Sequence, residues 1–325
     1  MVIINVNGGL MINQKLETFK KNIINKKVAV LGMGISNRPL IRYLAELGVD
    51  LTVFDRSEMD ALIDSIKDLN DFNIKYSFGP NYLDNLKGFD VIFKTPIVRF
   101  DIPELLAEQK NGAVITSEME LFCELCPARK FGVTGSDGKT TTTTLIHLIL
   151  EKQGYKCWLG GNIGAPLIDK IDEISPDDMV ILELSSFQLH TMKNRIETAV
   201  MTNLSPNHLD VHLSMDEYVE AKENIFKYQS KDDNLILNYD NQITRAFASK
   251  AKGNFTYFSR LNNFTDSRDI ENTDLETDKY VYVDEGKIIC KNGSKLTEII
   301  KTDEIILPGL HNIENCLAAI AAVID

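Results

Sequence analysis

The stretch FGVTGSDGKTTTTT, from Phe131 to Thr144, constrains this chain more than any other part of its sequence. It has the order of an apolar strand, a glycine turn and the start of a helix. Gly135 and Gly138 allow backbone N–H groups to converge on phosphate oxygens, and a helix N-terminus adds the positive end of its dipole. Lys139 would neutralise the outer phosphates, and Thr140 would offer a hydroxyl to Mg²⁺. The turn therefore predicts a nucleotide-phosphate site.

The turn departs from the full Walker pattern in one place. That pattern needs a glycine five positions before Gly138, where this chain has Val133, so the loop is the shortened form G-x-x-G-K-T. A purely structural turn with a solvated Lys139 is the alternative. Five threonines that open an amphipathic helix after an apolar strand favour nucleotide binding.

Composition sets the outer limits of function. The length of 325 residues suggests two domains, and the apolar fraction of 44% describes a globular protein with no apolar run long enough to span a bilayer. A formal charge of −12 argues against nucleic acid as a partner, because phosphate backbones are bound through clustered Lys and Arg. We therefore expect neither nucleic acid nor membrane as a partner, while small anionic substrates stay possible.

Cysteine usage and the first residues predict a cytoplasmic protein. Five cysteines, an odd number in a large acidic chain, fit a reducing compartment. Cys123 and Cys126 form a lone C-x-x-C with no second pair of zinc ligands, so chance helical spacing explains it better. Residues 1–10 lack the basic start and apolar core of a signal peptide, and we expect a poorly ordered tail, with Met11 as an alternative start.

The chain from Lys27 begins with a βαβ unit. The strand Val28–Leu31 leads to a G-x-G turn and a helix, and the next strand, Leu51–Phe54, ends on Asp55, where a dinucleotide fold places the acidic residue that meets a ribose. Asn37 stands in place of the third glycine, so the pattern is weak evidence for NAD. It still predicts a helix N-terminus suited to a phosphate, with a tight turn alone as the alternative.

Further strands at 91–93 and 113–116, with a helix at 102–109 between them, complete a small doubly wound domain that ends near Pro127.

The second predicted domain continues with a helix at 140–153 and a buried strand at 180–182 that ends at Glu183. A carboxylate at a strand end beside a phosphate turn is the expected position of a Mg²⁺ ligand. The strand at 199–203 leads to His208, Asp210 and His212, which together favour a site, although Mg²⁺ prefers oxygen to imidazole.

Tyr218 and Lys222 are four residues apart and share one face of the predicted helix 216–229. A solvated lysine is the alternative for Lys222. Beyond the strand 234–238 we predict strands at 255–258, 280–283 and 287–290, the last two forming a hairpin that turns at Asp284–Gly286, and a mobile loop at 262–277.

Six motifs that occur in order carry a family resemblance: G-x-x-G-K-T at 135–140, G-N-I-G at 161–164, E-x-S-S-F-Q-L at 183–189, the segment 203–208, A-K at 221–222, and L-P-G-L-H-N-x-x-N at 307–315. From about Lys26 to its end the chain resembles the Mur ligases. The E-x-S-S-F-Q-L motif and the preceding G-x-G domain are similar to the member that joins D-glutamate to UDP-N-acetylmuramoyl-L-alanine. Two departures are Ser136-Asp137 in place of the commoner Thr-Asn, and Asn37-Arg38 in place of small residues.

The resemblance implies a two-step reaction. ATP phosphorylates the carboxylate of UDP-N-acetylmuramoyl-L-alanine, and the amine of D-glutamate then attacks the acyl phosphate and expels phosphate. Charge neutralisation during phosphoryl transfer requires Lys139 and two Mg²⁺ ions, with Mn²⁺ as an alternative. We expect a monomer.

The resemblance also implies roles for individual residues. Thr140 and Glu183 would hold the first metal ion, and His208 and a carbamylated Lys222 the second. Forming the carbamate needs a neutral amine, hence a lysine with a pKa below its usual value of about 10.4. The residues implied for catalysis are Lys139, His208 and Lys222; for ATP, Gly135, Ser136, Asp137, Gly138, Lys139, Thr140, Thr141, Asn312 and Asn315; and for the UDP substrate, Gly34, Ser36, Asp55, Arg56, Asn162, Ser185 and Gln188.

The expected organisation is a lead-in at 1–25, a Rossmann-like UDP-substrate domain at 26–128 and a P-loop NTPase-like ATP-binding domain at 129–325. Mur ligases have a third, Rossmann-like domain that holds the incoming amino acid, and this chain stops straight after the predicted helix 312–323. We therefore expect a shortened form that lacks the D-glutamate site, binds ATP weakly and ligates little.

Three other classes of protein are alternatives. A folylpolyglutamate synthase shares the loop and the lysine, but its phosphate loop lies near the N-terminus. A nicotinamide-dependent oxidoreductase would leave the second phosphate turn unexplained. A non-catalytic module would bind the nucleotides without joining anything.

Overall fold

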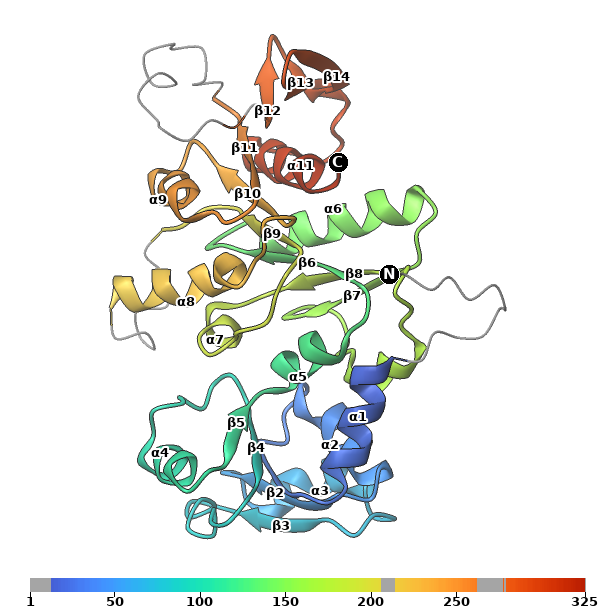
Figure 1. Ribbon diagram of the computed structural model, residues 1–325, viewed down its shortest axis with the longest axis vertical. Coiled ribbons are helices and arrows are strands. Elements are labelled where there is room, and N and C mark those ends of the chain that lie inside the picture. Colours follow the sequence, from blue (N-terminus) through green and yellow to red (C-terminus); the bar gives the residue numbers. More distant parts are fainter. Residues whose placement is uncertain (1–12, 206–213, 262–276, 278, 325) are drawn as a thin grey trace. The chain divides into compact units, whose positions relative to one another are not determined.

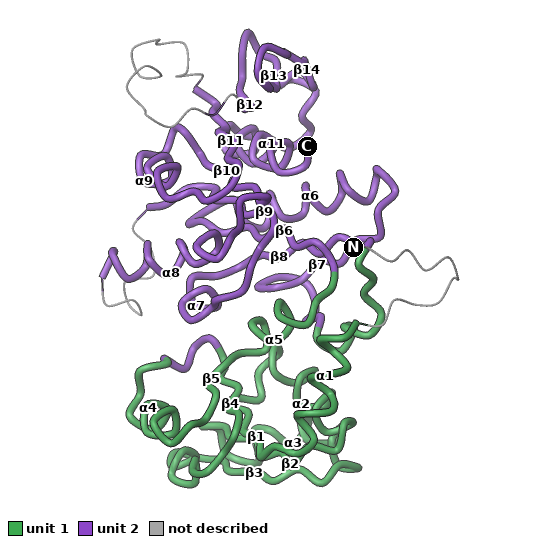
Figure 2. The backbone as a smooth tube through the Cα atoms, viewed as in Figure 1, with its two compact units in different colours: residues 1–95, 100–127, 168–176 green, residues 96–99, 128–167, 177–325 purple. Residues whose placement is uncertain are grey.

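Two sheets organise the protein, one in each of two units (Figures 1 and 2). The computed structural model describes residues 13–205, 214–261, 277 and 279–324. Unit 1 comprises Met1–Thr95, Phe100–Pro127 and Ile168–Pro176, and unit 2 comprises Pro96–Arg99, Ala128–Leu167 and Asp177–Asp325. The predicted α/β class is confirmed in both units.

The sheet of unit 1 is parallel throughout its described strands, which lie in the order β3-β2-β1-β4-β5. The chain therefore builds outward from β1 in one direction to β3 and then in the other direction from β4 to β5. The place where this order reverses, between β1 and β4, is the topological switch point of the sheet. The strands are β1 (Lys27–Leu31), β2 (Asp50–Asp55), β3 (Lys75–Phe78), β4 (Val91–Lys94) and β5 (Val114–Thr116).

Helices of unit 1 pack their apolar faces against this sheet. The central strand β1 is apolar over Val28–Leu31 and fully buried, as expected of a parallel strand that is covered on both faces. The helices of unit 1 are α1 (Gln14–Ile23), α2 (Asn37–Glu46), α3 (Met59–Lys67), α4 (Pro103–Lys110), α5 (Glu118–Leu125) and the 3₁₀ helix η1 (Ile168–Glu173).

Helix α1 forms within the segment that sequence reasoning treated as a lead-in. Asn13 caps it, because its Oδ1 accepts from the N–H of Leu16 at 3.2 Å, and its Nδ2 donates to the carbonyl of Leu125 at 2.7 Å. Leu16 and Ile23 are buried. The missed signal was the Asn cap followed by apolar residues at helical spacing.

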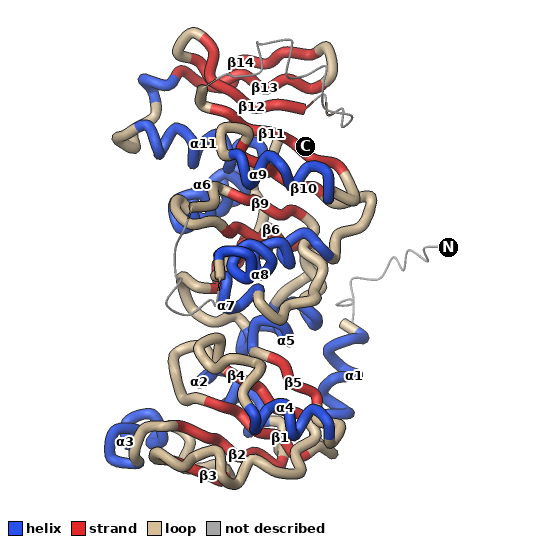
Figure 3. The backbone as a smooth tube through the Cα atoms, turned by 90° about the vertical axis from the view of Figure 1, so that its left-hand side faces the viewer, coloured by secondary structure: helices blue, strands red, loops and turns tan. Residues whose placement is uncertain are grey.

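The sheet of unit 2 has the described strand order β14-β13-β12-β11-β10-β9-β6-β8-β7. Strands β6 to β12 pair in parallel, and β12, β13 and β14 form an antiparallel edge that is visible in Figure 3. The strands are β6 (Arg129–Thr134), β7 (Cys157–Gly161), β8 (Met179–Glu183), β9 (Thr198–Met201), β10 (Asn234–Asn238), β11 (Asn254–Ser259), β12 (Lys279–Asp284), β13 (Lys287–Asn292) and β14 (Lys295–Lys301).

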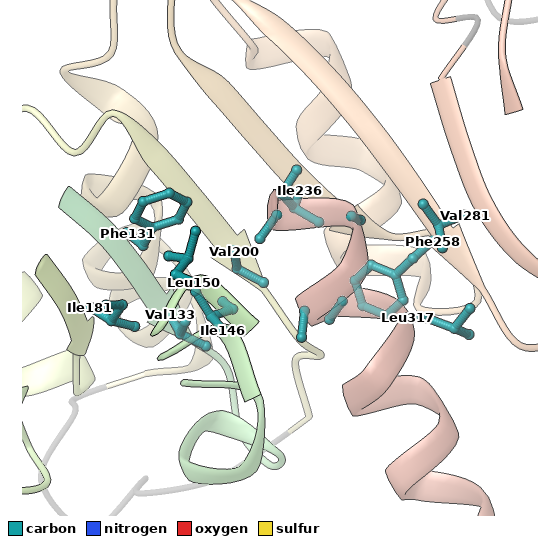
Figure 4. Close-up of a cluster of buried hydrophobic side chains, with 14 of the residues drawn as sticks. Phe131, Val133, Ile146, Leu150, Ile181, Val200, Ile236, Phe258, Val281 and Leu317 are labelled. Carbon is teal, nitrogen blue, oxygen red and sulfur yellow. The ribbon is translucent and has the colours of Figure 1, made fainter. Parts of the chain in front are cut away.

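Two long helices of unit 2 share one core on one face of this sheet. Figure 4 shows Ile146 and Leu150 of α6 beside Phe131 and Val133 of β6, with Leu317 of α11 in the same cluster. A Cβ at Gly132, which points to the other face, would meet Ile225 of α8, so α8 packs on the opposite side. The helices are α6 (Lys139–Lys152), α7 (Ser186–Leu189), α8 (Met215–Lys227), α9 (Gln242–Ala246) and α11 (Leu310–Val323), with 3₁₀ turns η2 (Phe247–Lys250) and η4 (Thr302–Glu304).

The predicted hairpin between 280–283 and 287–290 is confirmed as β12 and β13, which pair up to Asp284 and Lys287. Glu285 and Gly286 have positive φ angles of 44° and 75°, as a two-residue hairpin turn requires. Strand β14 was missed because its residues are mostly exposed and carry little apolar alternation. Of the loop predicted at 262–277, only residue 277 lies within the described residues. Among the described helices, none is long and apolar enough to cross a membrane.

Candidate functional site

The predicted phosphate turn joins β6 to α6 in unit 2, and its two glycines are required by space as well as by conformation. Gly138 is the N-cap of α6 with φ 79°, and a Cβ there would collide with Oδ1 of Asn315. A Cβ at Gly135 would collide with Oγ1 of Thr202. The turn therefore admits only glycine at these positions without rearrangement of its neighbours.

Residues that follow β9 hold the turn in place. The N–H of Ser136 donates to the carbonyl of Asn203 at 2.9 Å, and the N–H of Asp137 donates to Oδ1 of the same residue at 2.9 Å. Thr202 Oγ1 donates to the carbonyl of Asp137 at 2.6 Å. The amides of the first turn of α6, which have no intrahelical acceptor, are the donors suited to phosphate oxygens.

Two lysines meet at one carbonyl of the turn. Lys139 Nζ donates to the carbonyls of Gly135 and Ser136 at 3.0 and 2.8 Å. Lys222 Nζ, from α8, donates to the same carbonyl of Gly135 at 2.9 Å and to Thr134 Oγ1 at 3.1 Å. Phosphate oxygens in this turn would therefore lie near the amino groups of both lysines.

Lys222 is 2% exposed, so the alternative of a solvated helix lysine is wrong. Burial, together with repulsion by Lys139, lowers the pKa of Lys222 to about 7, although attraction to Glu183 opposes the shift in part. The Lys222 side chain is therefore substantially neutral near neutral pH.

Tyr218 connects Lys222 to the turn. Its ring lies 4.9 Å from Lys222 Nζ, and its hydroxyl is 3.0 Å from Ser136 Oγ. Ser136 Oγ also donates to the carbonyl of Ser205 at 3.0 Å. Sequence reasoning placed Tyr218 and Lys222 on one helix face but did not find the contact with Ser136, because that pairing joins residues 82 positions apart.

Thr140 and Glu183 meet beside the turn, as predicted. Thr140 Oγ1 donates to Glu183 Oε2 at 2.7 Å, and Asn162 Nδ2 donates to Glu183 Oε1 at 2.8 Å. A hydroxyl and a carboxylate are the hard oxygen donors that Mg²⁺ takes, and it commonly completes its shell with substrate phosphates and water. The residues therefore fit Mg²⁺. Asn162, predicted to contact the UDP substrate, here orients the carboxylate.

Only one of the two predicted ligands of the second metal ion lies within the described residues. Lys222 is described, whereas His208 lies outside the described residues, together with Asp210 and His212. Within the described ranges no group of three His, Cys, Asp or Glu side chains gathers as a metal site. Cys123 and Cys126 are buried and form no disulfide.

Asn312 and Asn315, at the start of α11, lie against the turn. Asn315 Nδ2 donates to Asn312 Oδ1 at 3.1 Å, and Thr142 Oγ1 donates to Asn315 Oδ1 at 3.4 Å. Asn312 Nδ2 donates to the carbonyl of Pro308 at 2.7 Å. Thr141, also predicted for ATP, is half-buried in the first turn of α6.

Ser185 and Gln188 use their polar atoms within α7. Ser185 Oγ accepts from the N–H of Gln188 at 3.2 Å, and Gln188 Oε1 accepts from the N–H of Ser185 at 3.0 Å, which is a capping box. Their predicted contact with the UDP substrate stays a prediction.

In unit 1, Asp55 holds the G-x-G turn from the end of β2. Its carboxylate accepts from the N–H of Met33 at 2.7 Å and from the N–H of Ser57 at 2.8 Å. Gly34 is exposed in the turn, and Ser36 is half-buried at the N-cap of α2 without a side-chain capping bond. Arg56 is exposed. The four predicted residues thus form two pairs, one that follows the carboxyl end of β1 and one at the carboxyl end of β2.

Asn37, which replaces the third glycine, stabilises the same turn. It is 1% exposed, and its Nδ2 donates to the carbonyls of Leu31 and Gly32 at 3.0 and 3.1 Å. An asparagine that satisfies two turn carbonyls is therefore compatible with the fold of the G-x-G segment.

Sequence reasoning missed Lys94, the last residue of β4. It is 3% exposed and lies in register with Leu31 of β1. The signal was a single charge at the end of the otherwise apolar strand sequence Val-Ile-Phe-Lys.

Two family models match the chain. The Mur ligase middle domain matches residues 133–323, and the Mur ligase MurD-like N-terminal domain matches residues 26–117. The first match contains the phosphate turn, Glu183, Lys222 and Asn315.

Curated relatives with the name UDP-N-acetylmuramoylalanine–D-glutamate ligase are similar over almost the whole chain. The protein of Acetivibrio thermocellus is 58% identical over 313 residues, and that of Ruminiclostridium cellulolyticum is 55% identical over 313 residues. Each alignment covers 96% of this chain and 64% of the relative, so the chain spans just under two thirds of the length of these proteins.

Solved structures support the fold. A UDP-N-acetylmuramate:L-alanyl-gamma-D-glutamyl-meso-diaminopimelate ligase from Neisseria meningitides superposes with a TM-score of 0.56 at 18% identity, over 91% of this chain and 92% of that one. A murein peptide ligase from Psychrobacter arcticus gives a TM-score of 0.52 at 17% identity, over 91% of this chain and 64% of that one. With its phosphate turn, its two-sheet architecture and both family models in agreement, the chain belongs to the Mur ligase family.

Proposed function

We propose that this chain provides the UDP-substrate and ATP-binding parts of an ATP-dependent ligase that joins D-glutamate to UDP-N-acetylmuramoyl-L-alanine. The observation that carries the proposal is the meeting of Lys139 and Lys222 at the carbonyl of Gly135, beside the Thr140–Glu183 pair. The names and identities of the curated relatives support the choice of substrates.

In the first step, a carboxylate oxygen of the substrate attacks the γ-phosphorus of ATP, the bond from that phosphorus to the bridging oxygen breaks, and ADP leaves. In the second step, the amine of D-glutamate attacks the acyl carbon, the C–O bond to phosphate breaks, and the amine loses a proton. The first step brings two anions together, so Lys139 and the first-turn amides of α6 would stabilise the charge on the transferred phosphoryl group.

Thr140 and Glu183 would hold Mg²⁺, and Asn162 would keep the Glu183 carboxylate oriented. When bound, the ion supplies charge neutralisation on the phosphate oxygens.

We infer that the amine of Lys222 is converted to a carbamate before catalysis. A neutral amine adds CO₂ with formation of an N–C bond and release of a proton, which yields a carbamate anion. Burial, which lowers the pKa of Lys222 to about 7, keeps enough neutral amine for this reaction near neutral pH. The carbamate would replace a repelling ammonium by an oxygen ligand, with His208 as the partner ligand proposed from the family.

The domain assignment also belongs to this proposal, with the UDP substrate bound by residues 26–128 and ATP by residues 129–325 in a monomeric cytoplasmic protein. The amides of Met33 and Ser57 donate to the carboxylate of Asp55, and this ordered turn at the end of β2 supports the assignment of unit 1. The contacts proposed with the UDP substrate are Gly34, Ser36, Asp55, Arg56, Asn162, Ser185 and Gln188.

The test is capture of the acyl phosphate. The protein is incubated with ATP, Mg²⁺ and UDP-N-acetylmuramoyl-L-alanine, and borohydride then reduces any acyl phosphate to an alcohol that mass spectrometry detects. We expect an alcohol that requires ATP and the alanyl substrate. No alcohol, or the same yield with a pteroyl substrate in its place, would contradict the proposed function.

A further inference from the structure

Helix α8, which brings Tyr218 and Lys222 to the phosphate turn, has a second polar face that the proposed chemistry does not use. Glu217 and Asn224 are seven residues apart, so they share one face of α8, next to the face that carries Tyr218 and Lys222. Helices α7 and α8 pack together (Figure 1). The second face of α8 contacts the end of α7.

Glu217 makes the first of these contacts. Its Oε1 lies 3.3 Å from Nε2 of His190, the residue that follows α7, and accepts a hydrogen bond from Arg99 Nη2 at 2.9 Å. Arg99 is part of unit 2, in the segment Pro96–Arg99. All three side chains are half-buried, so removal of the carboxylate would leave a partly shielded guanidinium without this partner.

Asn224 makes the second contact, two turns further along α8. Its Nδ2 donates to the carbonyl of Leu189 at 2.9 Å and to the carbonyl of His190 at 3.3 Å. The last carbonyls of a helix have no donor within the helix, and Asn224 supplies one for α7. The contacts of Glu217 and Asn224 with Leu189 and His190, here named the α7–α8 clamp, hold α8 at two points.

The α7–α8 clamp connects the helix of Lys222 with the segment of Glu183, the carboxylate that would hold Mg²⁺. Glu183 ends β8, and α7 begins at Ser186 with a capping box that fixes the short connection. A second link runs through Thr134. Lys222 Nζ donates to Thr134 Oγ1 at 3.1 Å, and this hydroxyl donates to the carbonyl of Leu184 at 2.7 Å. The structure therefore ties Lys222 to this segment by its side chain and by its helix.

We propose that Glu217 and Asn224 are positioning residues that set the place of Lys222 relative to Glu183 at the phosphate turn. The inference rests on the proposed function, in which a substrate carboxylate is phosphorylated at that turn, and adds the residues that hold the helix of Lys222. Catalysis of phosphoryl transfer consists almost entirely of positioning and electrostatic stabilisation. The amine of Lys222, or the carbamate formed from it, acts only where α8 places it.

The test separates ligand binding from phosphoryl transfer in two variants, Glu217→Ala and Asn224→Ala. At saturating ATP and UDP-N-acetylmuramoyl-L-alanine, each should form acyl phosphate about 10- to 100-fold more slowly than wild type, because a displacement of about 1 Å can cost about 100-fold in rate. Titration calorimetry should give unchanged dissociation constants for both ligands, since the amides of the turn and Lys139 are retained.

Two further variants distinguish a positioning role from a general loss of structure. Glu217→Gln keeps an oxygen acceptor for Arg99 and should recover most of the rate that Glu217→Ala loses. The matched control is Glu220→Ala, which removes an exposed glutamate of the same helix and should react as wild type does. Urea unfolding of each variant identifies any that is not folded under the assay conditions.

The outcomes separate this inference from the proposed function. Wild-type rates in both Glu217→Ala and Asn224→Ala would overturn the positioning role and leave the ligase proposal standing. A loss of rate that is matched by an equal loss of ATP affinity, or that Glu220→Ala shares, would show a general weakening of unit 2 and would also overturn the inference. Absence of acyl phosphate with wild type would contradict the proposed function, and the positioning role would fall with it.

Discussion

At the scale of single residues, the two lysines that contact the phosphate turn differ in their environments. Lys139 is half-buried at the start of α6, whereas Lys222 is almost completely buried and surrounded by Tyr218, Thr134 and the carbonyl of Gly135. Burial shifts the pKa of Lys222 to about 7. Lys222 is therefore suited to react as a neutral amine.

Lys222→Ala should therefore lose acyl-phosphate formation and regain part of it when formate or acetate is added. These carboxylates can occupy the space of the removed side chain and supply the oxygen ligand that the carbamate would provide. The measurement is the rate of ATP-dependent acyl-phosphate capture with and without the added anion. The matched control is Lys227→Ala, an exposed lysine of the same helix. Absence of rescue, combined with an unmodified Lys222 in mass spectra, would contradict the carbamate.

A second residue-scale prediction concerns Glu118 in the first turn of α5. Its side chain is 4% exposed, Oε1 has no hydrogen-bond partner among the described residues, and burial, with repulsion by Asp169, raises its pKa to about 8. Because the folded state holds the proton more tightly than the unfolded state, the stability contributed by protonated Glu118 is complete below about pH 4.5. It is lost as the pH rises through about 8.

Glu118→Gln should match wild type in the free energy of unfolding at pH 5 and exceed it at pH 8.5, with a difference that grows by at most about 1.4 kcal/mol per pH unit. Urea unfolding across this pH range provides the measurement, and Glu124→Gln, exposed on the same helix, is the control. A difference that stays constant with pH would show that Glu118 does not titrate in this window.

At the scale of elements, the turn between β6 and α6 is held by segments that are distant in sequence. Thr202 and Asn203 bind it from the end of β9, Tyr218 and Lys222 from α8, and Asn315 from α11. The two glycines make these close approaches possible. Substituting either of them should therefore disturb the structure more than substituting a glycine at another helix end.

Gly138→Ala should weaken ATP binding by at least about tenfold, because positive φ strains alanine and its Cβ would displace Asn315. Gly154→Ala is the control: it lies just beyond the other end of α6, has φ 94°, and has no atom within 4 Å of a built Cβ. It should cost about 1 kcal/mol in stability and leave ATP binding intact. Equal ATP affinity in both variants would show that the turn tolerates a Cβ.

Local pattern was enough to predict the α/β class, the phosphate turn, the Thr140–Glu183 pair and the hairpin at Asp284 to Gly286. These features depend on neighbours in sequence or on the rule that parallel strands end at one edge. The contact of Tyr218 with Ser136 and the burial of Lys222 and Lys94 depend on which strands pair, so spacing along the chain could not reveal them. Strand β14 was missed because exposure removes the apolar alternation on which strand prediction rests.

At the scale of the whole molecule, the proposal requires a strongly acidic chain to bind two anionic nucleotides, which is possible when lysines are concentrated locally. The formal charge is −12, yet Lys139 and Lys222 meet at the turn of unit 2, and Lys94 lies at the switch point of unit 1. The electrostatic potential at each site depends mainly on the charges close to it, because salt at physiological concentration screens most of the effect of distant charges. We therefore propose a separate nucleotide site in each unit.

Calorimetric titration of ATP with Mg²⁺, and separately of UDP-N-acetylmuramoyl-L-alanine, into wild type and Lys139→Ala tests this account most directly. The predicted result is that wild type binds both ligands. Lys139→Ala should lose ATP binding by about 10-fold or more, the effect of one charged hydrogen-bonding group, and keep its affinity for the uridine substrate. Equal weakening of both ligands by Lys139→Ala, or wild type that binds neither, would contradict the assignment of two nucleotide sites to two units.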